Sequence, residues 1–70
     1  MSVLTERLAH AHRLLIDPRH ARQSIGGIAY SCGFGDLSHF NHAFRRRYGA
    51  TPSEVRREQA KMEGRGGITH

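Results

Sequence analysis

The side chains best suited to chemistry gather in residues 36–48, where hydrogen-bonding and cationic residues alternate with phenylalanine. Phe40 and Phe44 lie four residues apart, so on a helix they share one side, which we expect to be buried. The polar side chains on or beside the opposite side are Ser38, His39, Asn41 and His42. Serine can pair with donors or acceptors on bases, and histidine and asparagine suit acceptors such as N7. The stretch therefore has the chemistry to read base edges; an ordinary solvated helix face is the alternative.

Arginines and glycines offer a second chemistry, the binding of phosphate groups. Arg45 and Arg46 come later in the same stretch, where backbone phosphates are better placed than bases. Gly26 and Gly27 fall in the first turn of an earlier expected helix, where N–H groups and the helix dipole favour an anion. The alternative is that a frayed helix end simply tolerates two glycines. The residues predicted to contact phosphates are Arg22, Gly26, Gly27, Arg45, Arg46 and Arg56.

Metal binding and catalysis are weaker interpretations of these residues. Cys32, His39 and His42 could be metal ligands, but structural zinc sites usually have four ligands with paired cysteines, and no C-x-x-C motif occurs. We expect Cys32 to fill a small apolar space instead. A Cys–His nucleophile needs an orienting group and a pocket, for which so small a domain has little room. The sequence therefore predicts no metal, no cofactor and no enzyme activity.

The composition favours a polyanionic partner. The 70 residues include 11 Lys and Arg against 6 Asp and Glu, which gives a net charge of +5 and a pI near 10.7. Small basic domains typically bind nucleic acid, although a merely soluble cationic surface is the alternative. A single cysteine excludes an internal disulfide and fits the reducing cytoplasm. No apolar run reaches membrane-spanning length and no signal-peptide core is found, so we expect a cytoplasmic protein without a membrane partner.

Two helices must position the polar stretch, and the first is expected over residues 2–16. Ser2 is a suitable N-cap, and Asp17 ends the helix because the residue before a proline avoids the helical region. Its apolar side comprises Leu4, Leu8, Ala11, Leu14 and Leu15. The residues expected to be exposed are Arg7, His10, His12 and Arg13. A polar connector over residues 17–23 follows, and Ser24 then caps the second helix.

A glycine-bearing turn joins this second helix to the polar stretch. The run 32–35 breaks the helical period and holds Gly33 and Gly35, both able to adopt a positive φ. Asp36 is a good N-cap for the next helix, which Gly49 ends in the left-handed conformation. Two short helices with such a turn are typical of a helix-turn-helix, whose second helix can lie in the DNA major groove. A helical hairpin that only packs is the alternative.

A last helix is expected to begin near residue 51. Thr51 and Glu54 form a capping box, and Pro52 occupies the first helical position, where its missing N–H is harmless. We expect the helix to fade between residues 60 and 63. The predicted divisions are a first helix at 1–16, a helix-turn-helix unit at 17–58 and a disordered tail at 59–70. The predicted core comprises Leu8, Ala11, Leu14, Leu15, Ile25, Ile28, Ala29, Phe34, Phe40, Phe44 and Val55.

An ordered set of motifs spans residues 24 to 57. It consists of Ser24-Ile25, Ile28-Ala29, Cys32-Gly33-Phe34, Ser38-His39-Phe40, the run from Ala43 to Gly49, the run from Thr51 to Glu54, and Arg56. This set resembles the second helix-turn-helix unit of the AraC/XylS-type transcriptional regulators. Arg7-Leu8, Ala11 and Leu14-Leu15 are similar to the linker helix that joins the two units of that family. The resemblance covers residues 2 to about 58 and implies a recognition helix with Ser38, His39 and His42 facing bases.

The expected fold is all-α: a small helical domain with a helix-turn-helix, made of a homeodomain-like trihelical core plus the linker helix. The expected function is a sequence-specific DNA-binding module of a transcription regulator in the bacterial nucleoid, with helix 36–48 in the major groove of a promoter or operator. The resemblance also implies RNA polymerase, or an upstream helix-turn-helix unit, as a further partner.

The sequence departs from the family pattern in three places. Members usually carry two units, and Met1 falls at the start of the linker helix, so we expect the first unit to be missing. Gly26 and Gly27 replace polar or acidic helix formers, and His42 stands where arginine is frequent. The alternative function is therefore a truncated fragment or interaction module that keeps the fold but binds no specific DNA alone.

Overall fold

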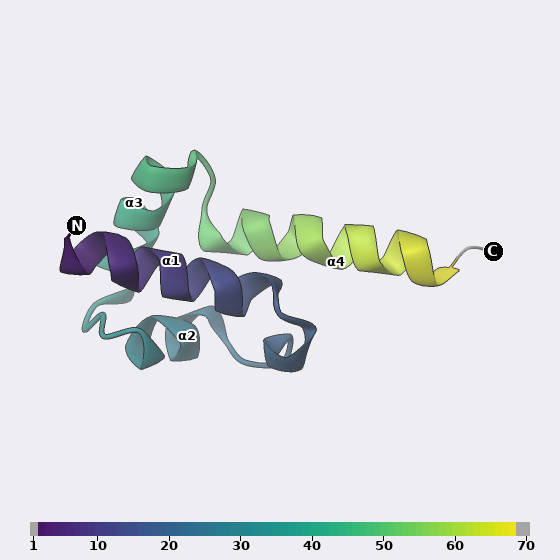
Figure 1. Cartoon of the computed structure of the whole chain (residues 1–70), viewed down its shortest axis with the longest axis horizontal. Coiled ribbons are helices and arrows are strands. Elements are labelled where there is room, and N and C mark those ends of the chain that lie inside the picture. The colour runs from purple at the N-terminus through teal and green to yellow at the C-terminus, as the bar shows by residue number, and fades with distance from the viewer. Residues whose placement is uncertain (1, 69–70) are drawn as a thin grey trace.

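The computed structural model describes the backbone of residues 2–68 and the side chains of residues 2–61. The element order is α1 (Val3–Ile16), a 3₁₀ turn η1 (Pro18–His20), α2 (Ile25–Ser31), α3 (Leu37–Tyr48) and α4 (Pro52–Ile68). The described residues contain no strand, so the predicted all-α fold is confirmed. In Figure 1, α1 lies between α2 on one side and α3 with the start of α4 on the other, while the rest of α4 projects beyond the bundle. No helix in the described part is long and apolar enough to cross a membrane.

Polar side chains start the first three helices where the sequence predicts. The Ser2 hydroxyl accepts the Thr5 N–H at 3.1 Å, and the Ser24 hydroxyl accepts the Gly27 N–H at 2.9 Å. The Asp36 carboxylate accepts the Ser38 N–H at 3.0 Å. Each bond satisfies an N–H that would otherwise lack a helical partner, and caps of this kind typically contribute about 1 kcal/mol.

The turn between α2 and α3 closes in a Schellman motif. The Gly33 N–H donates to the Tyr30 carbonyl at 3.0 Å, and the Phe34 N–H donates to the Ala29 carbonyl at 2.9 Å. Gly33 has φ +94°, and a Cβ built on it would lie 2.9 Å from Nε of Arg7 on α1. The positive φ therefore favours glycine here, whereas the Arg7 side chain could move to make room for a Cβ. Gly35, in contrast, does not take a positive φ.

The end of α3 and the start of α4 also follow the sequence. Gly49 adopts φ +77° and donates its N–H to the Arg45 carbonyl at 2.7 Å, as expected for a left-handed helix end. The Thr51 N–H donates to the Glu54 carboxylate at 2.8 Å, and the Glu54 N–H donates to the Thr51 hydroxyl at 3.2 Å. This reciprocal pair is the predicted capping box.

One hydrophobic core joins α1, α2, the turn and α3. Its buried members are Leu8, Ala11, Leu15, Ile28, Ala29, Cys32, Phe34, Phe40 and Phe44. The prediction is confirmed for eight of them and for the burial of Cys32, which was expected at the turn. It is wrong for Leu14, Ile25 and Val55, which pack against the core while only partly buried. Leu14 adjoins the buried Leu15, Ile25 is the first residue of α2, and Val55 lies in the first turn of α4, so the three cover the margin of the core.

Two further expectations are corrected by the structure. His12 is half-buried rather than exposed, because its ring packs on Tyr48 with centroids 4.8 Å apart and on Phe44 at 6.1 Å. Helix α4 continues to Ile68 rather than ending between residues 60 and 63. Residues 59–63 are strong helix formers with no proline after them, and each later glycine costs only about 1 kcal/mol. The last two residues of the predicted tail lie outside the described part.

Candidate nucleic-acid interface

Packing on one side of α3 decides which side of that helix faces outward. Phe40 and Phe44 are fully buried, and their ring centroids lie 5.7 Å apart. Phe34 from the α2–α3 turn packs on Phe40 at 4.9 Å, which joins α3 to the preceding helix. With three aromatic rings in contact, α3 cannot rotate about its axis without opening the core. Burial of the apolar side of α3 therefore keeps its polar side facing outward.

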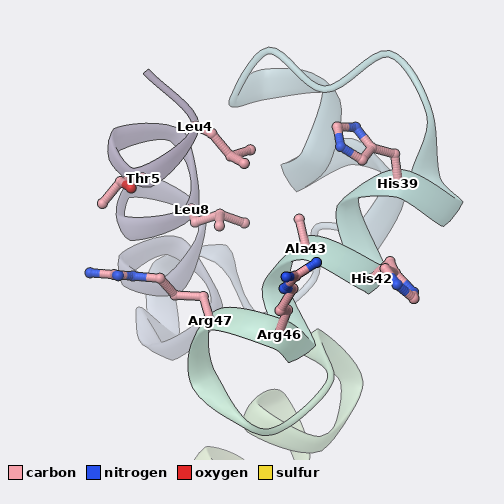
Figure 2. Close-up of a pocket in the computed structure, with 8 residues that line it drawn as sticks. All are labelled: Leu4, Thr5, Leu8, His39, His42, Ala43, Arg46 and Arg47. Atoms are coloured by element: carbon pink, nitrogen blue, oxygen red, sulfur yellow. The ribbon is translucent and has the colours of Figure 1, made fainter. Parts of the chain in front are cut away.

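The predicted base-reading residues occupy this outward side to different degrees. Ser38, His39 and His42 are exposed, whereas Asn41 is only partly exposed. The His39 ring meets Phe34 edge-on at 5.9 Å, which ties one reading side chain to the core. Figure 2 shows that His39 leans toward α1 while His42 points away from it. The structure thus brings Ser38, His39 and His42 to one exposed surface and leaves Asn41 at its margin.

The arginines of α3 extend this surface with positive charge. Arg45, Arg46 and Arg47 are exposed in the last turn of the helix, and none forms an ion pair with a side chain that the structure describes. Arg22 is exposed in the turn that leads into α2. These guanidinium groups are therefore available to phosphates, which they can hold with two hydrogen bonds at once.

The two glycines at the start of α2 do not offer equivalent N–H groups. The Gly27 N–H already donates to the Ser24 hydroxyl at 2.9 Å, so it is not available to a phosphate in this arrangement. Around Gly26 no heavy atom lies within 4 Å of a built Cβ, which means that packing does not require glycine there. Of the predicted pair, only Gly26 keeps an N–H that the described residues leave for a ligand.

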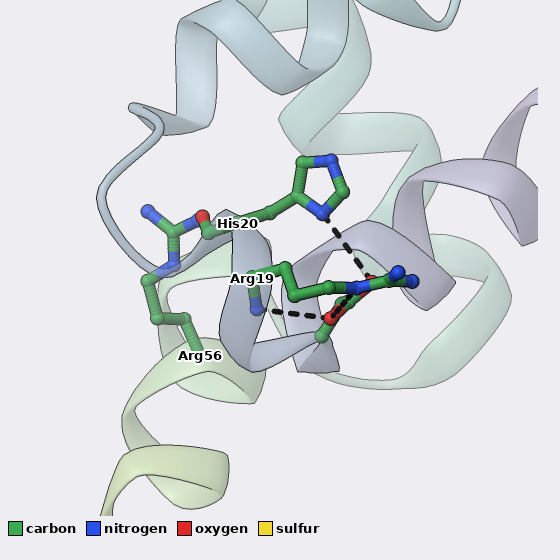
Figure 3. Close-up of polar contacts among 4 residues, drawn as sticks. Arg19, His20 and Arg56 are labelled. Atoms are coloured by element: carbon green, nitrogen blue, oxygen red, sulfur yellow. Dashed lines mark hydrogen bonds and ion pairs between the residues drawn. The ribbon is translucent and has the colours of Figure 1, made fainter.

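Arg56 has a different place from the one expected for a phosphate contact. It is partly buried on α4, and its Nη2 donates to the His20 carbonyl of η1 at 3.2 Å. Its Nε is buried without a hydrogen-bond partner in the described structure. Figure 3 shows Arg56 reaching from α4 to η1. Arg56 thus links the last helix to the connector. No local sequence signal distinguishes it from its neighbour Arg57, which is exposed.

The connector itself is organised by Asp17. Its carboxylate accepts the Arg19 backbone N–H at 2.9 Å and lies 3.0 Å from Nη2 of the same arginine. The side-chain hydrogen bond from Arg19 is the largest cause that lowers the pKa of Asp17 to about 2. Nδ1 of His20 lies 3.4 Å from Oδ2 of the same carboxylate. This cluster fixes the chain as it passes from α1 toward Arg22 and α2.

The remaining reactive side chain, Cys32, lies in the core. Burial raises the pKa of its thiol, which favours the unreactive protonated form. His39 and His42, in contrast, are exposed on α3. No group of three or more histidine, cysteine or acidic residues that could hold a metal ion occurs among the described residues.

Comparison with known proteins assigns the chain to a family. A family model described as a helix-turn-helix domain covers residues 3–58. The chain belongs to the AraC-type helix-turn-helix family. It is therefore a DNA-binding module of a transcription regulator, and the resemblance stated from its motifs is confirmed.

Individual relatives support the same assignment. The transcriptional activator RhrA of Rhizobium meliloti (strain 1021) is 51% identical over 55 residues, which are 79% of this chain and 17% of that protein. The HTH-type transcriptional activators RhaS of Enterobacter sp. (strain 638) and Citrobacter koseri are 48% and 46% identical over 50 residues, covering 71% of this chain and 17% of each relative. The chain thus spans 17% of the length of these curated relatives. No solved structure matches it significantly.

Proposed function

We propose that α3 lies in the major groove of a promoter or operator and reads its sequence through Ser38, His39 and His42, with Asn41 at the margin. The observation that carries this proposal is the division of α3 into a side locked by Phe40 and Phe44 and an outward side rich in hydrogen-bonding groups. The first two turns of recognition helices reach base edges most readily, and these polar residues lie there. Hydroxyl and imidazole groups supply the donors and acceptors that discriminate bases.

The proposal assigns phosphate contacts to exposed cations around the reading residues. Arg45 and Arg46 follow them on α3, and Arg22 precedes α2, so the cations lie before and after the reading residues along the chain. The Gly26 N–H adds a backbone donor at the start of α2. Arg56 and Gly27 act indirectly, since one holds α4 to η1 and the other completes the cap of α2. Contacts of this kind fix position without carrying sequence information.

The wider role follows the named relatives. RhrA and RhaS are transcriptional activators, and we propose that this chain serves activation, with RNA polymerase or an upstream helix-turn-helix unit as a further partner. Its place is then the nucleoid of a bacterial cytoplasm. Membership of a family of regulators supports a role without enzyme activity.

Selection from a randomised duplex library tests the reading role. The wild-type chain is compared with Ser38→Ala, His39→Ala and the control Ser53→Ala, which alters an exposed serine on α4. We expect Ser53→Ala to select the wild-type sequence, whereas the other two variants lose discrimination at single positions, by about 1–3 kcal/mol each. If all four chains select the same bases equally well, α3 is not the reader. If none selects any sequence, the chain is a fragment or interaction module without specific binding of its own.

A further inference from the structure

Leu37, the first residue of α3, is a large apolar side chain that the fold leaves in the open. It keeps 42% of its surface exposed. Among the described side chains, it belongs neither to the core nor to the partly buried apolar residues that pack against the core. Single exposed leucines are common on protein surfaces, so exposure alone assigns Leu37 no role. Its position on the helix has to supply the argument.

The helical period arranges the outward side of α3 in rows, because residues four apart lie one above the other. The row that begins with the base-reading serine consists of exposed side chains: Ser38, His42 and Arg46. The row on one side of it contains His39 and Ala43, which line a groove against α1. The row on its other side consists of Leu37, Asn41 and Arg45. Leu37 therefore borders the reading surface on the side opposite His39.

The first turn of α3 holds Leu37 in a fixed place beside Ser38. The Asp36 carboxylate accepts the Ser38 N–H at 3.0 Å, which fixes the start of the helix. Phe40, three residues after Leu37, is fully buried and anchors the same turn to the core. The N-terminal residues of a recognition helix are those that contact base edges. With α3 in the major groove, the Leu37 side chain therefore comes to the bases together with that of Ser38.

We propose that Leu37 reads the C5-methyl group of a thymine in the operator, an inference that rests on the proposed function. The thymine methyl lies in the major groove, and apolar side chains distinguish thymine by contact with it. Such a contact removes apolar surface of both partners from water. Asn41, four residues further along the row, suits N6 and N7 of adenine. Four helical residues rise about 6 Å and bases stack about 3.4 Å apart, so the thymine lies about two base pairs from any base that Asn41 reads.

A protein partner is a poorer occupant of this position. Interface cores bury contiguous apolar surface, whereas the neighbours of Leu37 on the outward side of α3 are the polar Ser38 and Asn41. One leucine among hydrogen-bonding side chains instead matches a base-pair edge, where the thymine methyl lies among donors and acceptors.

Replacement of thymine by deoxyuridine tests the contact, because uracil keeps the base pairing and lacks only the methyl group. The duplex selected by the wild-type chain is synthesised with each thymine replaced in turn, and affinity is measured by fluorescence anisotropy. We expect one replacement, at or next to the base pair whose selection Ser38→Ala alters, to weaken binding about fourfold, the effect of one buried methyl group. A selected site without thymine there overturns the proposal.

A matched pair of variants assigns the methyl contact to one side chain. Leu37→Ala and Leu4→Ala remove leucines of nearly equal exposure, 42% and 41%, from α3 and α1. We expect Leu37→Ala to bind the thymine and deoxyuridine duplexes equally, and Leu4→Ala to keep the fourfold difference. This comparison is a double-mutant cycle between chain and DNA, so a general loss of affinity cancels. Circular dichroism checks that both variants are folded.

A second change in the DNA needs no variant chain. The same thymine pair is replaced by a cytosine–guanine pair, with and without a methyl group at C5 of the cytosine. We expect the wild-type chain to bind the methylated duplex about fourfold more tightly than the unmethylated one. Equal binding of the two duplexes overturns the readout of the methyl group.

The outcomes separate this inference from the proposed function. A methyl effect that persists in Leu37→Ala, or that Leu4→Ala also abolishes, overturns the role of Leu37 and leaves α3 as the reader. The same holds if the chain selects a sequence in which no thymine shows a methyl effect. A wild-type chain that selects no sequence refutes the proposed function, and the readout by Leu37 is refuted with it.

Discussion

The two sides of α3 follow different physical rules. On the inner side, rings pack in succession: Phe34 on Phe40 at 4.9 Å, Phe40 on Phe44 at 5.7 Å, and Phe44 on Tyr48 at 4.7 Å. On the outer side, Ser38, His39 and His42 are exposed, and of these three the His39 ring meets a core ring, that of Phe34. Shape and volume constrain the inner side, because packed interiors leave few voids. The outer side can change its chemistry while α3 keeps its position.

The largest effect should come from the inner side. Phe44→Ala removes a ring with no exposed surface, and truncating a buried phenylalanine typically costs about 3–5 kcal/mol. A core in a chain this small rarely supplies more than about 3–5 kcal/mol of net stability, so the loss removes most or all of it and we expect this variant to be mostly unfolded at 25 °C. Thermal melting followed by circular dichroism measures it. Leu37→Ala, on the same helix but at a side chain 42% exposed, is the control and should melt close to wild type; a cooperative, wild-type-like melt of Phe44→Ala would show that the packing is not needed.

A change on the outer side should alter specificity and leave the fold intact. His42→Arg replaces an exposed imidazole on α3 by a fork of donors, which can bind O6 and N7 of guanine together. We expect preference at one base pair to shift toward guanine by about 1–3 kcal/mol, with an unchanged melting temperature. Competition binding against duplexes that vary at single positions measures the shift. A variant that melts like wild type yet selects the same bases would place His42 outside the reading surface.

The same contrast explains what the sequence could predict of the fold. Ser2, Ser24 and Asp36 begin their helices as expected, since a cap acts through N–H groups only two or three residues away. The burial of Phe40 and Phe44 also follows from local spacing. The placement of His12 could not be predicted in this way, because its contact with Tyr48 joins residues 36 positions apart. The extent of α4 was also missed, since glycines weaken a helix without fixing where it ends.

The candidate site, like the fold, could be predicted only in part. Exposure of Ser38, His39 and His42 follows from placing the phenylalanines inward. Arg56 was assigned to phosphate by its charge, but its Nη2 is bonded to the His20 carbonyl, a contact set by how α4 packs near η1. A groove also lies between α1 and α3, with Leu4 and Ala43 among its lining residues. It could not be predicted either, because no local pattern gives the relative position of the two helices. Charge and helical period thus predict which face of a helix is exposed. Contacts between residues distant in sequence can be found only once the fold is known.

A smaller effect should distinguish arginines that contact phosphate from arginines outside the DNA interface. Arg46→Ala removes an exposed guanidinium of α3, and Arg57→Ala removes an exposed one of α4. Each phosphate contact contributes about −0.9 to the slope of log affinity against log salt concentration. We expect Arg46→Ala to flatten that slope by roughly one unit on specific and non-specific duplexes alike, and Arg57→Ala to leave it unchanged. Equal slopes for both variants would indicate that the charge of α3 acts only through the overall field.

The smallest effect concerns carboxylates that lie away from the outer side of α3. The Arg19 guanidinium holds the pKa of Asp17 at about 2, and the Thr51 N–H lowers the pKa of Glu54. A carboxylate with a lowered pKa in the folded state stabilises the fold above its unfolded value, near 4, and this contribution is lost as the pH falls toward 2. Urea titrations at pH 6, 4, 3 and 2 should therefore show falling stability, and Asp17→Asn should fall less steeply because it lacks one titrating group. If the stability of Asp17→Asn falls as steeply as that of wild type or more steeply, Asp17 is not a source of the acid sensitivity. The variant Glu54→Gln measures the contribution of the second carboxylate in the same way.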